Sequence, residues 1–65
     1  MTRPNNLRKI REAKLLSKLE LAKLAGVSPL TIDRVEKGMQ CRLATMRKIL
    51  SALGLKISQR RKVFK

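Results

Sequence analysis

The sequence predicts an all-α fold, a compact bundle of four to five short helices that forms one domain over residues 1–65. The composition favours helices, because Leu, Ala, Lys, Arg and Glu dominate it whereas Tyr and Trp are absent. Aliphatic side chains recur at helical spacing, and Ser and Gly stand where short helices would begin and end. A chain of this length buries only about 60% of its unfolded surface, so we expect a small aliphatic core.

The first two helices are expected over about Asn6–Lys14 and Lys18–Ala25. Asn5 or Asn6 is suited to cap the first helix, since its side-chain oxygen can accept from a free amide of the first turn. The motif SKLE begins at Ser17 and predicts a capping box, in which serine and glutamate each bond the other's backbone amide. Gly26 ends the second helix, because glycine adopts a left-handed backbone without steric cost.

The third helix is expected over residues 29–37, with Ser28 as its N-cap and Gly38 at its end. Pro29 falls in the first turn, where the amide that proline lacks would be unsatisfied anyway. The fourth helix is expected from about Arg42 to Leu53. It carries an aliphatic series at helical spacing: Leu43, Met46, Ile49, Leu50 and Leu53.

Both ends of the chain lie outside these four helices. Residues 58–65 are expected to form a short helical turn or a tail, with Ser58 as the cap of a turn through Val63. Phe64, the only aromatic residue, is expected to fold back onto the core. Residues 1–5 are expected to form a flexible arm, from which Arg3 would reach a nucleic acid.

The charge is strongly positive and unevenly placed along the chain. Seventeen Lys and Arg against four Asp and Glu give a net charge of +13, and no acid follows Glu36. Such a surface attracts polyanions over long range. A solvated face that maintains solubility is one alternative. Binding to an anionic membrane is another, although the apolar residues suit a bundle core better than one long amphipathic face.

The residue types exclude several classes of function. Histidine is absent and Cys41 is the only cysteine, so we expect neither a metal site nor an internal disulfide. We expect no enzyme activity, cofactor or small-molecule ligand, because no carboxylate pair or glycine-rich phosphate loop is apparent. With no secretion signal and no apolar run near the roughly 18 residues of a membrane span, a cytoplasmic location is expected. Cys41 itself is either a redox switch, with a pKa lowered by nearby cations, or a half-buried thiol.

The third helix has two contrasting faces. Ile32 and Val35 point one way, toward a core, and the opposite face carries Leu30, Asp33, Arg34 and Lys37. A short helix that is held by its back and exposes its N-terminus is suited to enter the major groove of DNA. The glycine break before it would set the angle at which it projects. An ordinary helical corner in a small bundle is the alternative.

The stretch REAKLLSKLELAKLAGVSPLTIDRVEKG resembles the helix-turn-helix of the Cro and phage-repressor family, also called the XRE family. The family pattern LSxxELAxxAGVSxxTIxRxExG is almost fully present, and the resemblance covers roughly Leu7 to Leu55. The resemblance implies a lambda-repressor-like bundle. It also implies binding to operator DNA, usually as a two-fold dimer on paired half-sites.

The resemblance assigns roles to particular positions. Four residues of the third helix fall where the family reads bases: Pro29, Leu30, Asp33 and Arg34. Six residues fall where the family meets phosphates: Lys18, Ser28, Thr31, Lys37, Gln40 and Arg42. Arg11 and Glu36 match a pair that many relatives join in a structural salt bridge between the first and third helices.

The chain also departs from the family pattern. Pro29 and Leu30 replace residues that are often polar, so hydrogen bonding to bases is reduced, and Leu30 would pack on a thymine methyl or on a protein. Asp33 would accept from cytosine N4, pair with Arg34 or Lys37, or repel phosphate. Leu15 stands where relatives commonly have glycine, and the loop 39–42 is shorter than usual.

These inferences predict a small bacterial or phage-encoded transcriptional regulator, a repressor, that binds double-stranded DNA sequence-specifically as a homodimer. Two alternatives remain open: an antitoxin that binds a toxin protein and represses its own operon, and a low-specificity nucleic-acid-coating protein. A polymerase contact is a further possible protein interaction. Four apolar residues are expected to be partly exposed and available for such contacts: Leu15, Leu19, Leu30 and Met39.

Overall fold

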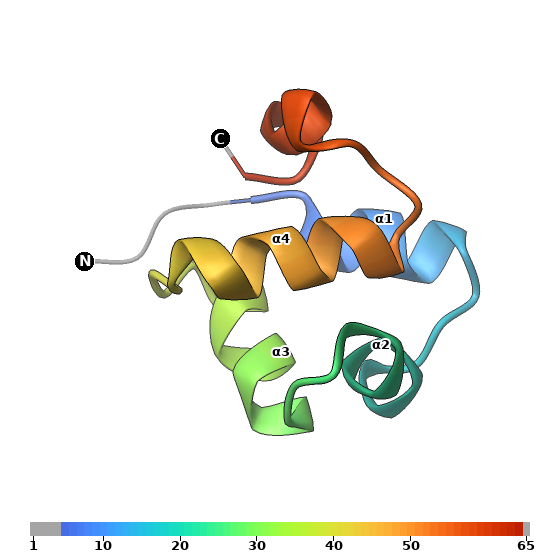
Figure 1. Cartoon of the computed structure of the whole chain (residues 1–65). Coiled ribbons are helices and arrows are strands. Elements are labelled where there is room, and N and C mark those ends of the chain that lie inside the picture. Colours follow the sequence, from blue (N-terminus) through green and yellow to red (C-terminus); the bar gives the residue numbers. More distant parts are fainter. Residues whose placement is uncertain (1–4, 65) are drawn as a thin grey trace.

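The computed structural model describes residues 5–64, which form a bundle of five short helices (Figure 1). The helices are α1 (Leu7–Ala13), α2 (Lys18–Ala25), α3 (Pro29–Glu36), α4 (Leu43–Ala52) and the 3₁₀ helix η1 (Ile57–Lys62). α4 crosses in front of α1, with α2 and α3 on one side of this pair and η1 on the other (Figure 1). The predicted all-α fold is confirmed. Among residues 5–64, no helix is long and apolar enough to cross a membrane.

The core collects apolar side chains from α1 to α4 and from the segment after η1. Its fully or almost fully buried members are Leu7, Leu21, Ala22, Ala25, Ile32, Val35, Ile49, Leu50, Leu53 and Val63. Phe64 packs against this cluster as the sequence predicts. Leu43, by contrast, is 70% exposed, although it continues the helical spacing of the buried residues of α4. Leu43 is the first residue of α4, and helical spacing does not show how far along a helix the core extends.

The predicted boundaries of α2 are confirmed in detail. Ser17 Oγ accepts from the Glu20 amide at 3.0 Å, and the Ser17 amide donates to Glu20 Oε1 at 3.0 Å. This second bond stabilises the charged carboxylate and lowers the pKa of Glu20. Gly26 follows the helix with φ +70°, in the left-handed region that favours glycine.

Two asparagines join the N-terminal segment to distant parts of the chain. Asn5 Oδ1 accepts from the Leu7 amide at 3.0 Å, and Asn5 Nδ2 donates to the Val35 carbonyl at the end of α3, at 2.6 Å. The Asn6 amide donates to the Val63 carbonyl at 2.9 Å. Asn6 is therefore the N-cap residue of α1 but its side chain makes no cap bond, and the side-chain bond to the first turn comes from Asn5 instead. The expected arm contact of Arg3 lies outside the described residues.

The C-terminal turn begins earlier than the sequence predicts and winds more tightly. η1 starts at Ile57 after Lys56, so Ser58 lies inside it and is not its cap. The Gln59 side chain takes the capping role, since its Oε1 accepts from the Lys56 amide at 2.9 Å. The residue that marks this boundary is therefore Gln59, three positions after Lys56. The prediction of Ser58 as the cap is wrong.

Leu15 is the non-glycine residue of the described chain that has a left-handed backbone, with φ +57°. Its side chain is 90% exposed, so no burial offsets the strain. The left-handed conformation costs a leucine about 1–2 kcal/mol, and glycine adds about 0.5–1 kcal/mol of unfolded-state entropy. We therefore expect Leu15→Gly to raise the free energy of unfolding by about 0.5–1 kcal/mol in urea titrations. Lys14→Gly, at the neighbouring residue with φ −93°, is the control and is expected to destabilise.

Candidate nucleic-acid interface

The exposed face of α3 is set by what its opposite face buries. Ile32 and Val35 are fully or almost fully buried in the core, as the helix pattern predicts. Leu30 is 56% exposed, and Arg34 is exposed beside it in the next turn. Two aliphatic side chains thus anchor α3 to the core. Its opposite face presents a strip to solvent that includes Leu30 and Arg34.

The turn between α2 and α3 brings the two helices close together. Ala22 of α2 is almost fully buried in the core, and its carbonyl accepts from the Val27 amide at 3.0 Å, just after Gly26. A small side chain at this position allows the backbones to approach, and the left-handed glycine turns the chain sharply between them. The predicted helix-turn-helix unit is therefore formed by residues 18–36.

The N-terminus of α3 is capped and remains accessible. Ser28 Oγ accepts from the Thr31 amide at 3.2 Å and lies 2.9 Å from Thr31 Oγ1. Ser28 and Pro29 are exposed and Thr31 is half-buried, so two hydroxyl groups stand at the start of the helix. The partial positive charge of a helix N-terminus and its free amides favour an anion there, which suits a phosphate contact.

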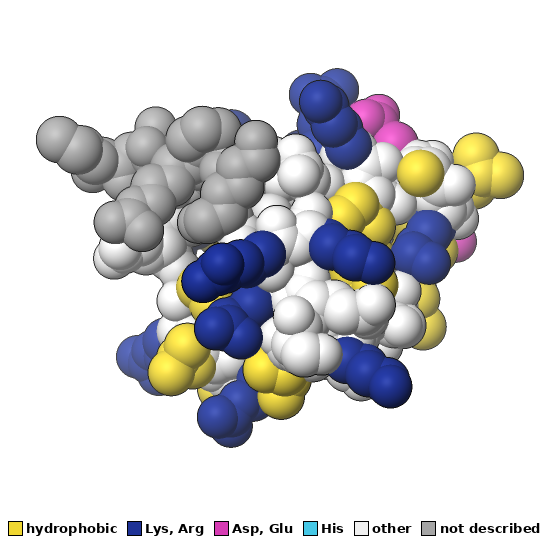
Figure 2. Space-filling model, turned by 90° about the horizontal axis from the view of Figure 1, so that it is seen from above, with side chains coloured by type: hydrophobic (Ala, Val, Ile, Leu, Met, Phe, Trp, Pro, Cys, Tyr) yellow, Lys and Arg dark blue, Asp and Glu magenta, His cyan; other side chains and the backbone are white. Residues whose placement is uncertain are grey.

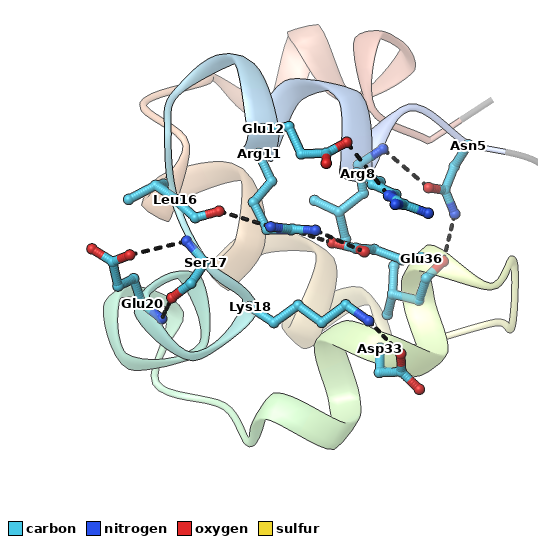
Figure 3. Close-up of polar contacts among 12 residues, drawn as sticks. Asn5, Arg8, Arg11, Glu12, Leu16, Ser17, Lys18, Glu20, Asp33 and Glu36 are labelled. Atoms are coloured by element: carbon cyan, nitrogen blue, oxygen red, sulfur yellow. Dashed lines mark hydrogen bonds and ion pairs between the residues drawn. The ribbon is translucent and has the colours of Figure 1, made fainter.

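Asp33 lies in the exposed strip between two lysines. Lys18 Nζ donates from α2 to Asp33 Oδ1 at 2.6 Å (Figure 3), and Lys37 Nζ lies 2.9 Å from Asp33 Oδ2. The bonds from Lys18 and then Lys37 lower the pKa of Asp33 to about 2. Of the two partners that the sequence offers for Asp33, Arg34 and Lys37, only Lys37 forms an ion pair with it among residues 5–64, and Lys18 is an additional partner that the sequence does not indicate. Both carboxylate oxygens are therefore engaged in the free protein, and one of the bonds links α2 to α3.

Arg11 and Glu36 form an almost fully buried ion pair between α1 and α3 (Figure 3). Arg11 Nε lies 2.6 Å from Glu36 Oε2, and its Nη2 donates to Oε1 at 3.3 Å. A third donor, Nη1, reaches the Leu16 carbonyl at 2.7 Å. The hydrogen bond to Glu36 raises the pKa of Arg11, against an opposing effect of burial. This pair fixes the last turn of α3 and the connection between α1 and α2.

The remaining candidate phosphate-contacting residues lie after α3. Lys37, Gln40 and Arg42 are exposed, and Arg42 is the N-cap residue of α4. Cys41 between them is half-buried, and burial raises the pKa of its thiol. Of the two interpretations of Cys41, the half-buried thiol is the one that the structure supports, because desolvation of the thiolate outweighs any effect of nearby cations on its pKa.

The geometry can be compared with known proteins. A model of the family HTH_3, described as helix-turn-helix, matches residues 7–59. The chain belongs to this family. This membership confirms the resemblance to XRE-type DNA-binding helix-turn-helix proteins that the sequence shows. No curated protein sequence matches the chain significantly.

Solved structures similar to this HTH_3 protein are described as regulators. The restriction-modification controller protein C.AhdI from Aeromonas hydrophila is 32% identical, with a TM-score of 0.78 and 85% of each chain covered. An HTH_3 family transcriptional regulator from Vibrio cholerae is 32% identical, with a TM-score of 0.75 over 85% of this chain and 32% of that one. A hypothetical transcription factor from Neisseria is also 32% identical, with a TM-score of 0.73 over 85% and 63%.

The titration of Asp33 tests the arrangement of its two lysines. We expect an NMR titration to place the pKa of Asp33 at about 2. Lys18→Met should raise this pKa more than Lys37→Met, because the Lys18 bond is the larger cause. The folded pKa lies below that of an unfolded aspartate, about 3.9, so this group stabilises the fold above pH ~4 and its contribution is lost toward pH ~2. Lys23→Met, on the same helix as Lys18, is the control and should leave the titration unchanged.

Proposed function

We propose that the protein is a small transcriptional repressor that binds a specific operator in double-stranded DNA with α3 in the major groove. The observation that carries this proposal is that α3 buries one face in the core and exposes the other. Its back is buried through Ile32 and Val35, while Leu30 and Arg34 face solvent beside an accessible N-terminus. A rigid helix presented in this way matches the docking of a recognition helix. The regulators among the structural neighbours support the same conclusion.

Base reading is proposed for four residues with unequal roles. Arg34 is exposed and forms no ion pair within residues 5–64, so its guanidinium is available for bidentate contact with guanine O6 and N7. Leu30 is suited to a thymine methyl group, and Pro29 offers only apolar contact. Asp33 would accept from cytosine N4 after Lys18 or Lys37 has turned toward a phosphate, since both of its oxygens are otherwise engaged.

The proposed phosphate contacts surround this strip. Ser28 and Thr31 offer hydroxyl groups at the start of α3, and Lys18 stands at the start of α2. Lys37, Gln40 and Arg42 follow the end of α3. Contacts of this kind position the protein on the duplex and supply affinity, whereas base contacts supply the sequence preference.

We further propose that the protein binds as a homodimer on two half-sites. A single α3 has about two turns and reads only a few base pairs, so a second copy on a two-fold related half-site would be needed for a long operator. The exposed apolar side chains available for association include Leu19 on α2 and Leu43 on α4. A selection of bound duplexes from a random library at physiological salt should enrich a motif with two-fold symmetry. A flat outcome would instead support a coating protein or an antitoxin that requires its toxin.

Arg34→Ala is expected to lose discrimination at one base position of each half-site, by about 1–3 kcal/mol. Arg42→Ala is the matched control, because it removes one exposed cation outside the reading helix. We expect the control to weaken binding to all sequences alike and to reduce the salt slope by about 1. Fluorescence anisotropy with preferred and scrambled duplexes measures both variants. An equal loss on both duplexes for Arg34→Ala would rule out a reading role for this residue.

A further inference from the structure

A second cationic surface lies on the far side of the molecule from the reading helix. It is formed by four exposed side chains at η1, here called the η1 face: Lys56, Arg60, Arg61 and Lys62. Figure 1 shows η1 above α1 and α4, whereas α3 lies below them. When α3 lies in a DNA groove, the η1 face would therefore remain exposed to solvent on the opposite side of the protein.

The η1 face is not neutralised by the described part of the protein. The ion pairs formed among residues 5–64 involve Arg8, Arg11, Lys18 and Lys37, and none involves a cation of this face. Residues 43–64 contain no Asp or Glu. Like charges gathered in this way repel one another in the free protein, and a polyanion that binds there removes the repulsion.

The chemistry of the η1 face favours a phosphate backbone over a protein. Figure 2 shows this side of the molecule, with Lys and Arg side chains spread across it and Asp and Glu only toward its edge. The apolar side chains on it form separate small patches, whereas the centre of a protein interface is usually a continuous apolar area. Within η1 itself, Ile57 is the large apolar residue that is exposed. One such side chain gives too small an apolar area for the centre of a protein interface.

We propose that the η1 face binds the phosphate backbone of a second DNA duplex while α3 occupies the first. The protein then bridges two DNA segments, either two molecules or two sites on one looped molecule. Contacts from flexible lysine and arginine side chains to phosphates carry no sequence information, so the second duplex is held without base preference. This inference rests on the proposed binding of the first duplex by α3. It adds a second DNA-binding surface on the opposite side of the protein.

A capture experiment tests the bridging. A duplex that carries the selected motif is fixed to beads, the full chain is added, and a fluorescent duplex of unrelated sequence is offered. We expect wild-type protein to retain the second duplex, and Arg60→Gln/Arg61→Gln to lose most of it while still binding the fixed duplex. The salt slope for capture of the second duplex should fall by about 2, one unit for each phosphate contact removed. Lys14→Gln/Lys23→Gln removes the same charge from α2 and the end of α1 and should bridge normally.

The outcomes separate this inference from the proposed function. Failure of wild-type protein to bind the fixed duplex would contradict the role of α3. Binding of the fixed duplex without retention of the second would overturn the bridging alone. Bridging that survives Arg60→Gln/Arg61→Gln would assign it to two reading helices of one dimer and would also overturn the inference. Retention of fluorescent polyglutamate in place of DNA, with loss in the same variant, would show that the η1 face binds an acidic protein instead.

Discussion

Arg11→Ala is expected to lower the free energy of unfolding by about 3–5 kcal/mol, because it leaves the Glu36 carboxylate buried without its partner. The side chains of Arg11 and Glu36 are only 9% and 5% exposed, so water cannot replace the lost bonds. The same substitution removes the donor to the Leu16 carbonyl. A chain of 65 residues has a total stability of about 3–10 kcal/mol, so this loss is a large fraction of the free energy of unfolding.

Two further variants separate the buried pair from surface charge. Arg8→Ala removes an exposed arginine that lies 3.4 Å from Glu12 on the same helix, and it should cost at most about 0.5 kcal/mol. Arg11→Met/Glu36→Leu removes both charges and should recover part of the loss, although the Leu16 carbonyl remains without its donor. Circular dichroism during urea unfolding measures all three. Equal stability of Arg11→Ala and Arg8→Ala would show that the pair is solvated.

Ile32→Ala is expected to cost about 2–5 kcal/mol of stability, since the residue is fully buried and its loss leaves a cavity beneath α3. Ile32→Val removes one methylene group and should cost about 0.5–1.5 kcal/mol. The graded series tests whether α3 is held by close packing of its buried face. If α3 is the helix that reads DNA, affinity for DNA should fall with stability in this series, because α3 loses its fixed position.

The control for Ile32 is another apolar residue of the same helix. Leu30 is 56% exposed, and Leu30→Ala should change the free energy of unfolding by no more than about 0.5 kcal/mol. If Leu30 contacts a thymine methyl group, the variant should still lose affinity for the preferred duplex. A large loss of stability in Leu30→Ala would contradict the two-faced description of α3.

Features that depend on neighbours within one helical turn could be predicted from the sequence. The capping box at Ser17, the cap at Ser28 and the left-handed end at Gly26 are all formed as expected. The buried face of α3 follows from helical spacing, and the structure places Ile32 and Val35 in the core. These signals are local because each is set by a single turn of helix or by one backbone conformation.

Features that depend on distant segments could not be predicted in this way. The bonds of Asn5 and Asn6 to residues near the ends of α3 and η1 have no local signature. Leu43 fits the helical pattern but lies outside the core, and Lys18 reaches Asp33 across the turn. The pairing of Arg11 with Glu36 came from the family resemblance and not from spacing. Each of these contacts requires knowledge of which helices are neighbours.

The link made by Asn6 has a consequence for how the molecule opens. Besides the bond from its amide to the Val63 carbonyl, Asn6 donates from Nδ2 to the Lys62 carbonyl at 3.2 Å, and Asn6 and Lys62 are 56 positions apart. α2 and α3 are consecutive, so their packing requires closure of only a short loop, whereas the link closes a ring of almost the whole chain. We expect the ring to close late in folding and to open first by local fluctuation. The Asn6 amide proton, which the bond to the Val63 carbonyl protects, should then exchange with solvent while the amides of α2 and α3 stay protected, so the ends can fray without loss of the helix-turn-helix unit.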